Sequence, residues 1–225
     1  MPRVPRFSCH MRVKFCGITR IEDAREAARL GAWAIGLIHH EPSPRRVNPG
    51  VAAEIGAELR RRLEVVGVFV NPTLEEVVRA AEDESLTMLQ LHGDEGPAFC
   101  QEVARRTGCR VIKAFRVRSS AEVHAAEAFR TDLHLFDALR PGTRGGTGES
   151  FDWELLTDRR STVPFLLSGG LSPENVAEAV GIAHPYAVDV ASGVESAPGV
   201  KDHELMAAFF ARAQPTVRVA GGSEA

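Results

Sequence analysis

Several features that define other classes of protein are missing from this sequence of 225 residues. It has no apolar run near the roughly 20 residues that a helix needs to span a bilayer. Residues 1–10 lack the apolar stretch of a secretory signal. We therefore expect a cytoplasmic protein that has no membrane partner.

A surplus of positive charge is also missing, since the formal net charge is -3. The Arg-Arg-Arg run at residues 60–62 is typical of a solvated helix end. A nucleic-acid-binding surface needs a basic patch or stripe. The charge balance therefore predicts that the protein has no nucleic-acid partner.

Cysteine is scarce, and the four cysteines are Cys9, Cys16, Cys100 and Cys109. No two of them form a C-x-x-C pair, and their spacing matches no zinc site. A reducing compartment leaves such thiols free. The sequence therefore predicts neither a disulfide framework nor a zinc centre.

No linker rich in proline, glycine and serine divides the chain into compositionally different parts. Hydrophobic residues make up 44% and charged residues 25%, which is ordinary for a globular protein with a sizeable core. We expect one domain over residues 12–213. A flexible N-terminal extension at residues 1–11 and a flexible tail at residues 214–225 are expected to flank it.

What the sequence does contain is a regular alternation of short apolar runs and helical patterns. The apolar runs, read as strands, cover residues 12–15, 34–38, 65–70, 88–91, 110–114, 133–137, 164–167 and 186–190. The helical patterns cover residues 21–30, 49–62, 73–81, 97–106, 120–129, 173–180 and 202–212, with an irregular piece near 152–156. Eight such units predict an α/β fold, a single closed (β/α)₈ TIM barrel. One mistaken strand would make a doubly wound open sheet the alternative.

Reactive side chains stand where two of these strands end. Cys16 closes the first strand, and Asp137 closes the sixth. Barrel enzymes keep their chemistry at the C-terminal ends of the strands, so these two residues are candidates for an acid and a base. The alternative is that Cys16 is a small buried hydrophobic residue and that Asp137 caps a turn.

Glycines follow the last three strands, where barrels commonly bind phosphate. Backbone N–H groups approach an anion closely where no Cβ intervenes. The candidates for this phosphate site, with the serine beside them, are Gly145, Gly146, Gly148, Gly169, Gly170, Ser192 and Gly193. Ordinary turn glycines are the alternative.

Four further residues add polar groups to the strand ends. His92 follows the fourth strand and Asp189 lies in the eighth, and we expect both to bind substrate. Arg45 and Arg46 stand in the proline-stiffened loop of residues 42–46, where a guanidinium group suits a carboxylate or a second phosphate. A solvated basic loop is the alternative for the two arginines.

His39 and His40 invite a comparison with metal ligands. Adjacent side chains on an extended strand point to opposite faces, so one of them at most faces the barrel mouth together with His92. A histidine satisfied by neighbouring hydrogen bonds is the expectation.

Several motifs, in this order and spacing, resemble those of the phosphoribosylanthranilate isomerase family of tryptophan biosynthesis. The resemblance runs from about residue 12 to about residue 213. Its motifs are VKFCGIT at 13–19, SPR at 43–45, VGVFVN at 66–71, QLHG at 90–93, Asp137, GGTG at 145–148, FDW at 151–153, LSGGL at 167–171 and VDVASGVE at 188–195 with PGVKD after it.

This resemblance implies roles for three of the candidates. Cys16 would be the general base, Asp137 the general acid and Arg45 the partner of the anthranilate carboxylate, while the glycine turns would hold the phosphate. The reaction implied is an Amadori rearrangement of N-(5-phosphoribosyl)anthranilate to 1-(2-carboxyphenylamino)-1-deoxyribulose 5-phosphate. It needs no cofactor and no metal, the partner is this small substrate, and the chain would act as a monomer or a homodimer.

The chain departs from the family pattern at a few positions. They are His39 and His40 in place of aromatic or apolar residues, Arg46 in place of a frequent tyrosine, Phe15 in place of isoleucine and Ala191 in place of serine. These departures bear on substrate breadth. The alternatives are a related sugar-phosphate aminoaldose isomerase, a metal-dependent epimerase and a non-catalytic phosphate-binding barrel. Cys16 argues against the first, because the histidine-pathway enzyme has an aspartate at this position.

Overall fold

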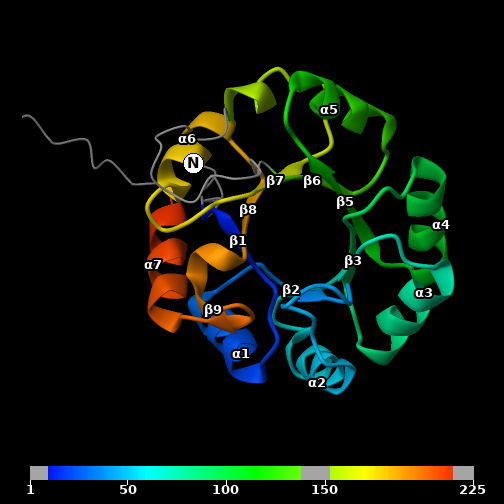
Figure 1. Ribbon diagram of the computed structural model, residues 1–225, viewed down its shortest axis with the longest axis vertical. Coiled ribbons are helices and arrows are strands. Elements are labelled where there is room, and N and C mark those ends of the chain that lie inside the picture. Colours follow the sequence, from blue (N-terminus) through cyan, green and yellow to red (C-terminus); the bar gives the residue numbers. More distant parts are fainter. Residues whose placement is uncertain (1–9, 138–152, 215–225) are drawn as a thin grey trace, which may run out of the picture.

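A ring of eight parallel strands forms the centre of the computed structural model, which describes residues 10–137 and 153–214 (Figure 1). The strands are β1 (Arg12–Cys16), β2 (Ala34–Ile38), β3 (Glu64–Phe69), β4 (Met88–Leu91), β5 (Arg110–Arg116), β6 (Leu133–Asp137), β7 (Phe165–Ser168) and β8 (Ala187–Val190). Pairing of β1 with β8, in which Lys14 lies opposite Asp189, closes the ring. The (β/α)₈ prediction is thus confirmed, and the open-sheet alternative is wrong.

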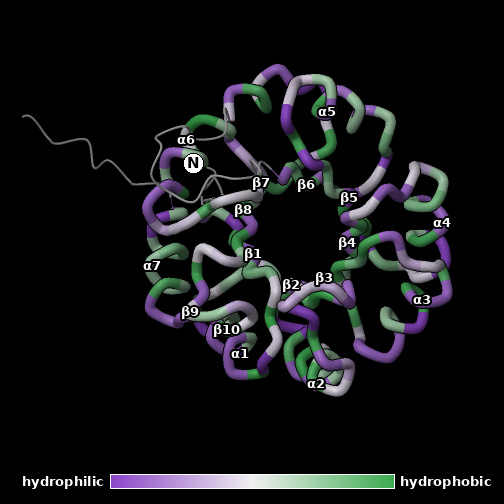
Figure 2. The backbone as a smooth tube through the Cα atoms, viewed as in Figure 1, coloured by the Kyte–Doolittle hydropathy of each residue, from purple (hydrophilic) through white to green (hydrophobic). Residues whose placement is uncertain are grey.

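Helices surround the ring and cover its outer surface (Figure 1). They are α1 (Ile21–Leu30), α2 (Pro49–Leu59), α3 (Leu74–Asp83), α4 (Pro97–Thr107), α5 (Ser120–Ala125), α6 (Val176–Ala183) and α7 (His203–Ala213). Short 3₁₀ turns add η1 (Ala126–Ala128), η2 (Trp153–Leu156) and η3 (Ser192–Val194). Figure 2 shows hydrophilic and hydrophobic residues interspersed along these helices, as amphipathic packing requires. None of the described helices is long and apolar enough to cross a membrane.

Local signals explain where several helices begin and end. Thr73 and Glu76 form a reciprocal capping box at the start of α3, and Asp202 accepts hydrogen bonds from the first backbone N–H groups of α7. Gly31 and Gly108 end α1 and α4 in the left-handed conformation. These caps satisfy backbone groups that the helices themselves leave unpaired.

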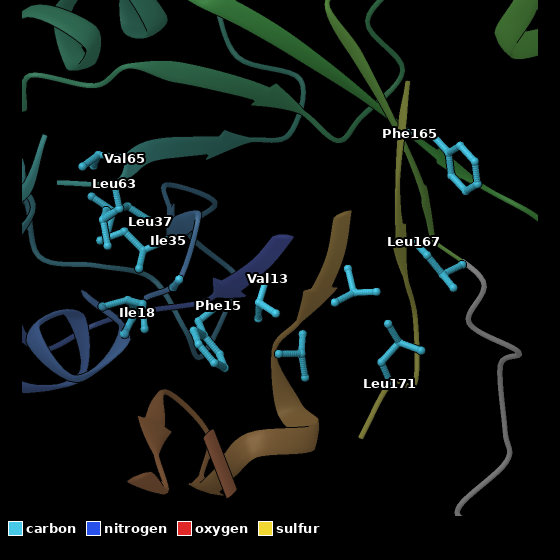
Figure 3. Packing of buried hydrophobic residues seen from close by; sticks show 14 of the residues in the cluster. Val13, Phe15, Ile18, Ile35, Leu37, Leu63, Val65, Phe165, Leu167 and Leu171 are labelled. Atoms are coloured by element: carbon cyan, nitrogen blue, oxygen red, sulfur yellow. The ribbon is translucent and has the colours of Figure 1, made fainter. Parts of the chain in front are cut away.

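The side chains of β1 alternate between two environments. Val13 and Phe15 face outward into the apolar layer between strands and helices, which Figure 3 shows around them. Lys14 and Cys16 face the interior of the barrel. Because successive side chains of a strand point to opposite faces, a two-residue spacing places the ammonium group and the thiol on the same side.

A hairpin that the sequence did not predict follows the barrel. It consists of β9 (Glu195–Ala197) and β10 (Val200–Lys201), which pair antiparallel before α7. At the chain ends, Met11 and Gln214 exchange hydrogen bonds. The predicted flexible segments fall mostly on residues 1–9 and 215–225, which lie outside the described residues, so the predicted domain boundaries stay predictions.

Candidate active site

The C-terminal ends of the strands surround a cavity of about 190 Å³. Cys16 of β1, Arg45 of the loop after β2, His92 after β4 and Asp137 of β6 all line it. Four of the residues singled out from the sequence, which come from four separate parts of the chain, therefore meet at one place. The predicted glycines Gly145, Gly146 and Gly148 lie outside the described residues.

Cys16 occupies the inner wall of this cavity and is 6% exposed. Burial raises the pKa of the Cys16 thiol, and the charge of Lys14 opposes that rise. Gly36 of β2 lies beside them, and a Cβ there would stand 2.7 Å from the Cys16 sulfur and 3.2 Å from Lys14 Nζ. The absence of a side chain at Gly36 thus leaves room for the thiol and the ammonium group.

Asp137 ends β6, and its side chain is 20% exposed. Its Oδ2 lies 3.4 Å from His92 Nε2, and its Oδ1 is buried without a hydrogen-bond partner among the described residues. Buried polar atoms are rarely left unpaired. An unpaired carboxylate oxygen at the cavity wall is therefore placed to meet a polar group of a ligand.

Polar contacts connect the two sides of the cavity. Lys14 Nζ donates to Asp189 Oδ1 at 2.7 Å and to Gln90 Oε1 at 3.0 Å. Gln90 Nε2 then lies 3.0 Å from His92 Nδ1. Because the amide nitrogen is a donor, His92 Nδ1 accepts and its Nε2 carries the proton toward Asp137.

Arg45 reaches the cavity from the loop after β2, as expected from its position beyond the strand. Its Nε donates to Glu195 at 2.9 Å and its Nη2 at 2.7 Å. Lys201 Nζ donates to the same carboxylate at 2.9 Å and to the backbone oxygen of Ala191 at 2.9 Å. The two cations lower the pKa of Glu195 against the effect of its burial. Glu195 thus holds the guanidinium group of Arg45 at the cavity edge.

The turns after β7 and β8 supply the other side of the cavity. Gly169 and Gly170, with φ of 94° and 63°, adopt a conformation that favours glycine, and both line the cavity with Ser192. A Cβ at Gly193 would lie 2.0 Å from the backbone oxygen of Leu171, so the two turns touch. This close backbone packing suits the anion site predicted there.

Asp189 also lines the cavity, but its carboxylate is engaged inside the protein. Besides Lys14, it accepts a hydrogen bond from Ser168 Oγ at 3.0 Å. Direct contact with a substrate stays a prediction for this residue.

The structure places other sequence candidates away from the cavity. The His39 ring stacks on the Phe69 ring with 4.7 Å between the ring centroids, and its Nε2 lies 3.1 Å from Glu84 Oε2. Arg46 forms an exposed ion pair with Glu41 at 3.1 Å. In the described part of the chain, no three His, Cys, Asp or Glu side chains are grouped to hold a metal ion.

A larger cavity of about 430 Å³ lies beside β4 and β5. It shares His92 with the smaller cavity, but its lining includes neither Cys16 nor Asp137 nor Arg45. Lys113, at its wall, is bound to Glu95 at 2.8 Å and to the backbone oxygen of Gly93. The smaller cavity is therefore the candidate active site.

Sequence reasoning missed Lys14, Gln90, Glu195 and Lys201 as parts of this site. Lys14 carried a usable signal, because strand alternation puts it on the face of Cys16. Glu195 and Lys201 stand in the motifs VDVASGVE and PGVKD, but they belong to a short hairpin without an apolar run, so no strand pattern placed them at the cavity.

Fold and site together define a barrel enzyme whose candidate acid, base and anion-binding groups gather at the C-terminal face of the strands. The family model for N-(5'-phosphoribosyl)anthranilate (PRA) isomerase matches residues 13–212. The chain belongs to this family.

Relatives and solved structures agree with the family match. The chain is 46% identical over 203 residues to N-(5'-phosphoribosyl)anthranilate isomerase of Geobacter sp. (strain M21), which covers 90% of this chain and 98% of the relative. The crystal structure of phosphoribosyl anthranilate isomerase from Thermotoga maritima is 40% identical with a TM-score of 0.81, covering 90% and 98% of the two chains. A structure of such an enzyme in complex with reduced 1-(o-carboxyphenylamino)-1-deoxyribulose 5-phosphate is 38% identical with a TM-score of 0.78, with the same coverage.

Proposed function

We propose that this chain catalyses the isomerisation of N-(5'-phosphoribosyl)anthranilate to 1-(2-carboxyphenylamino)-1-deoxyribulose 5-phosphate in tryptophan biosynthesis. The observation that carries the proposal is that Cys16, Asp137, Arg45 and the turns after β7 and β8 line one cavity in a chain of this family. The substrate has a carboxylate at one end and a phosphate at the other. The cavity offers a guanidinium group and a pair of glycine turns for these two anions.

Asp137 is the proposed general acid. Its protonated carboxyl group donates a proton to the furanose ring oxygen as the bond between that oxygen and C1 breaks. The lone pair of the anthranilate nitrogen forms the C1=N bond of a Schiff base, which carries a positive charge. The His92 contact at 3.4 Å orients the Asp137 carboxyl group for this transfer.

Cys16 is the proposed general base. Its thiolate removes the proton from C2, forming an S–H bond, and the electrons of the C2–H bond form the C1=C2 bond of an enolamine. The positive charge on nitrogen is neutralised in the same step. Tautomerisation then moves the proton of the C2 hydroxyl group to C1 and leaves a ketone at C2. Atoms and electrons balance within the substrate, so no oxidant or reductant enters.

The proposed binding roles follow the two anions. Arg45, fixed by Glu195, pairs with the anthranilate carboxylate. Gly169, Gly170 and Ser192 surround the phosphate through backbone N–H groups. The cytoplasmic location, the state as a monomer or homodimer and the absence of a nucleic-acid partner remain sequence-based predictions.

Fluorescence of the anthranilate group tests this function. The substrate is generated in solution, and its fluorescence is followed after addition of the protein in the presence of EDTA. We expect rapid decay with formation of the aminoketose. A folded protein that leaves the fluorescence unchanged would overturn the proposed function.

Variants test the two catalytic assignments. Cys16→Ala and Asp137→Ala should each lower kcat by about 10²- to 10⁴-fold, the usual contribution of an acid or a base, with the circular dichroism spectrum unchanged. Cys109→Ser is the matched control, since Cys109 contacts the backbone oxygen of Leu86 and does not line the cavity. Near-normal turnover in Cys16→Ala would rule out its role as the base.

A further inference from the structure

The thiol of Cys16 lies in surroundings that disfavour the form a base requires. Only a thiolate accepts a proton efficiently, yet Cys16 is 6% exposed and packs among the apolar side chains of the barrel interior. Burial in such surroundings raises the pKa of the thiol. A neighbouring group must therefore stabilise the negative charge of the sulfur if Cys16 is to act as proposed.

Lys14 is placed to do so. It precedes Cys16 by two residues on β1, faces the same side of the strand and is fully buried. Its Nζ has three donors, and Asp189 and Gln90 accept two hydrogen bonds from it, at 2.7 and 3.0 Å. Nζ and the Cys16 sulfur both lie beside Gly36, at 3.2 and 2.7 Å from the position that a Cβ would take there. The third donor of this ammonium group is therefore close to the sulfur.

The groups around the sulfur have opposing effects on its charge. Lys14 and Lys201 favour the thiolate, and Asp189 disfavours it; among these charges, Lys14 has the largest effect. Arg45 also interacts electrostatically with Cys16. Lys201 and Arg45 are both paired with Glu195, and Lys14 is paired with Asp189. Lys14 shares the strand of Cys16, and its Nζ lies beside the sulfur next to Gly36.

We propose that Lys14 is a positioning residue for the isomerase reaction, whose ammonium group holds Cys16 as a thiolate between β1 and β2, with Asp189 and Gln90 fixing that ammonium group in place. This inference rests on the proposed function for its catalytic meaning. Lys14 neither gives nor takes a proton during the reaction. The proton lost when the thiolate first forms goes to solvent, and the lysine remains charged.

Asp189 provides a sharp test, because it contacts the same ammonium group but carries the opposite charge. If the pair had a purely structural role, Lys14→Met and Asp189→Asn would both loosen the site and shift Cys16 in the same direction. If Lys14 stabilises the thiolate, the two variants shift the titration of Cys16 in opposite directions. The sign of each shift therefore separates electrostatics from packing.

Alkylation of the full-length protein by iodoacetamide measures this titration without substrate. The rate at Cys16 is followed against pH by mass spectrometry of the peptide that contains it, which distinguishes it from the other cysteines. For Lys14→Met we expect the midpoint to rise by about one pH unit or more, and for Asp189→Asn we expect it to fall. The acidic limb of the kcat/KM profile should move in the same directions. An unchanged midpoint in folded Lys14→Met, or equal signs in the two variants, would overturn the proposal.

The loss of one partner of a buried ion pair can prevent folding, so a double variant completes the experiment. Lys14→Met combined with Asp189→Asn removes both charges. Because Lys14 has the larger effect on Cys16, the alkylation midpoint of Cys16 in this double variant should lie above that of the wild type. A midpoint at or below the wild-type value would contradict the proposal. Wild-type turnover of phosphoribosylanthranilate is measured separately: its absence, with the expected alkylation shifts, would overturn the proposed function and leave the electrostatic effect of Lys14 established.

Discussion

Individual side chains link the two proposed catalytic residues across the barrel. The contacts run from Lys14, beside Cys16, through Gln90 and His92 to Asp137. Each member is buried or half-buried, where hydrogen bonds are stronger than in water. At the scale of the residue, the site is therefore one polar network, and its two ends are the proposed base and the proposed acid.

Arg45 should contribute mainly to substrate binding. Replacing it with alanine removes hydrogen bonds to a charged group, worth about 1.5–3 kcal/mol, so Arg45→Ala should raise KM by about 10- to 150-fold with a smaller change in kcat. Arg46→Ala is the control, because the Arg46 side chain is 46% exposed and pairs with Glu41 outside the cavity. Steady-state kinetics of both variants check this. An equal rise of KM in the two variants would contradict the role of Arg45.

The sequence identified the candidate reactive residues but not the side chains that hold them in place. Cys16, Asp137 and Arg45 were identifiable because a barrel collects whatever follows its strands at one face. Lys14 was overlooked because a lysine inside an apolar strand is usually expected to be exposed. Its burial depends on partners 76 and 175 residues away in the chain, and no local pattern reveals such pairs.

The elements of the barrel follow local rules closely. Predicted and observed strands coincide to within one or two residues, because each is a short Val-, Ile- or Leu-rich run enclosed by turn signals. The predicted helix at residues 173–180 begins instead at Val176, since Ser172 and Asn175 form a turn before it. The hairpin of β9 and β10 escaped prediction because strands of three and two residues carry no periodicity.

The contact between the turns after β7 and β8 yields a prediction about these elements. Gly193→Ala places a methyl group against the backbone oxygen of Leu171, so we expect a loss of about 1–3 kcal/mol in the free energy of unfolding and a higher KM. Gly181→Ala is the control, since Gly181 is exposed on α6 and a Cβ there meets nothing within 4 Å. That variant should keep the wild-type KM and gain up to about 1 kcal/mol of stability. Urea denaturation and substrate titration measure both effects; a Gly193→Ala protein equal to wild type in both would be evidence against this packing.

At the scale of the whole molecule, stability depends on a barrel closed through strands from the two ends of the domain, β1 and β8. Buried polar groups in this wall couple its stability to pH. His134 of β6 is fully buried among Phe115 and Phe136, and burial lowers its pKa to about 4. Its Nδ1 has no hydrogen-bond partner among the described residues, so the folded chain holds the neutral ring.

This histidine predicts a loss of stability in mild acid. Between pH 6.5 and about 4 the unfolded chain binds a proton at His134 that the folded chain does not. The free energy of unfolding should therefore fall as the pH is lowered through this window, by about 3 kcal/mol from this residue. His134→Phe should flatten that part of the profile, whereas the exposed His124→Gln should not. Urea denaturation across the window measures the slopes, and equal slopes in wild type and His134→Phe would contradict the prediction.

Lys201 gives the molecule one more property. Its ammonium group donates hydrogen bonds to Glu195, which forms an ion pair with Arg45, and to the backbone oxygen of Ala191 in the turn after β8. One side chain therefore ties the guanidinium end of the cavity to its glycine end. We expect the spacing between these two ends to be a fixed length, so the barrel should discriminate among doubly anionic molecules by how far apart their charges lie.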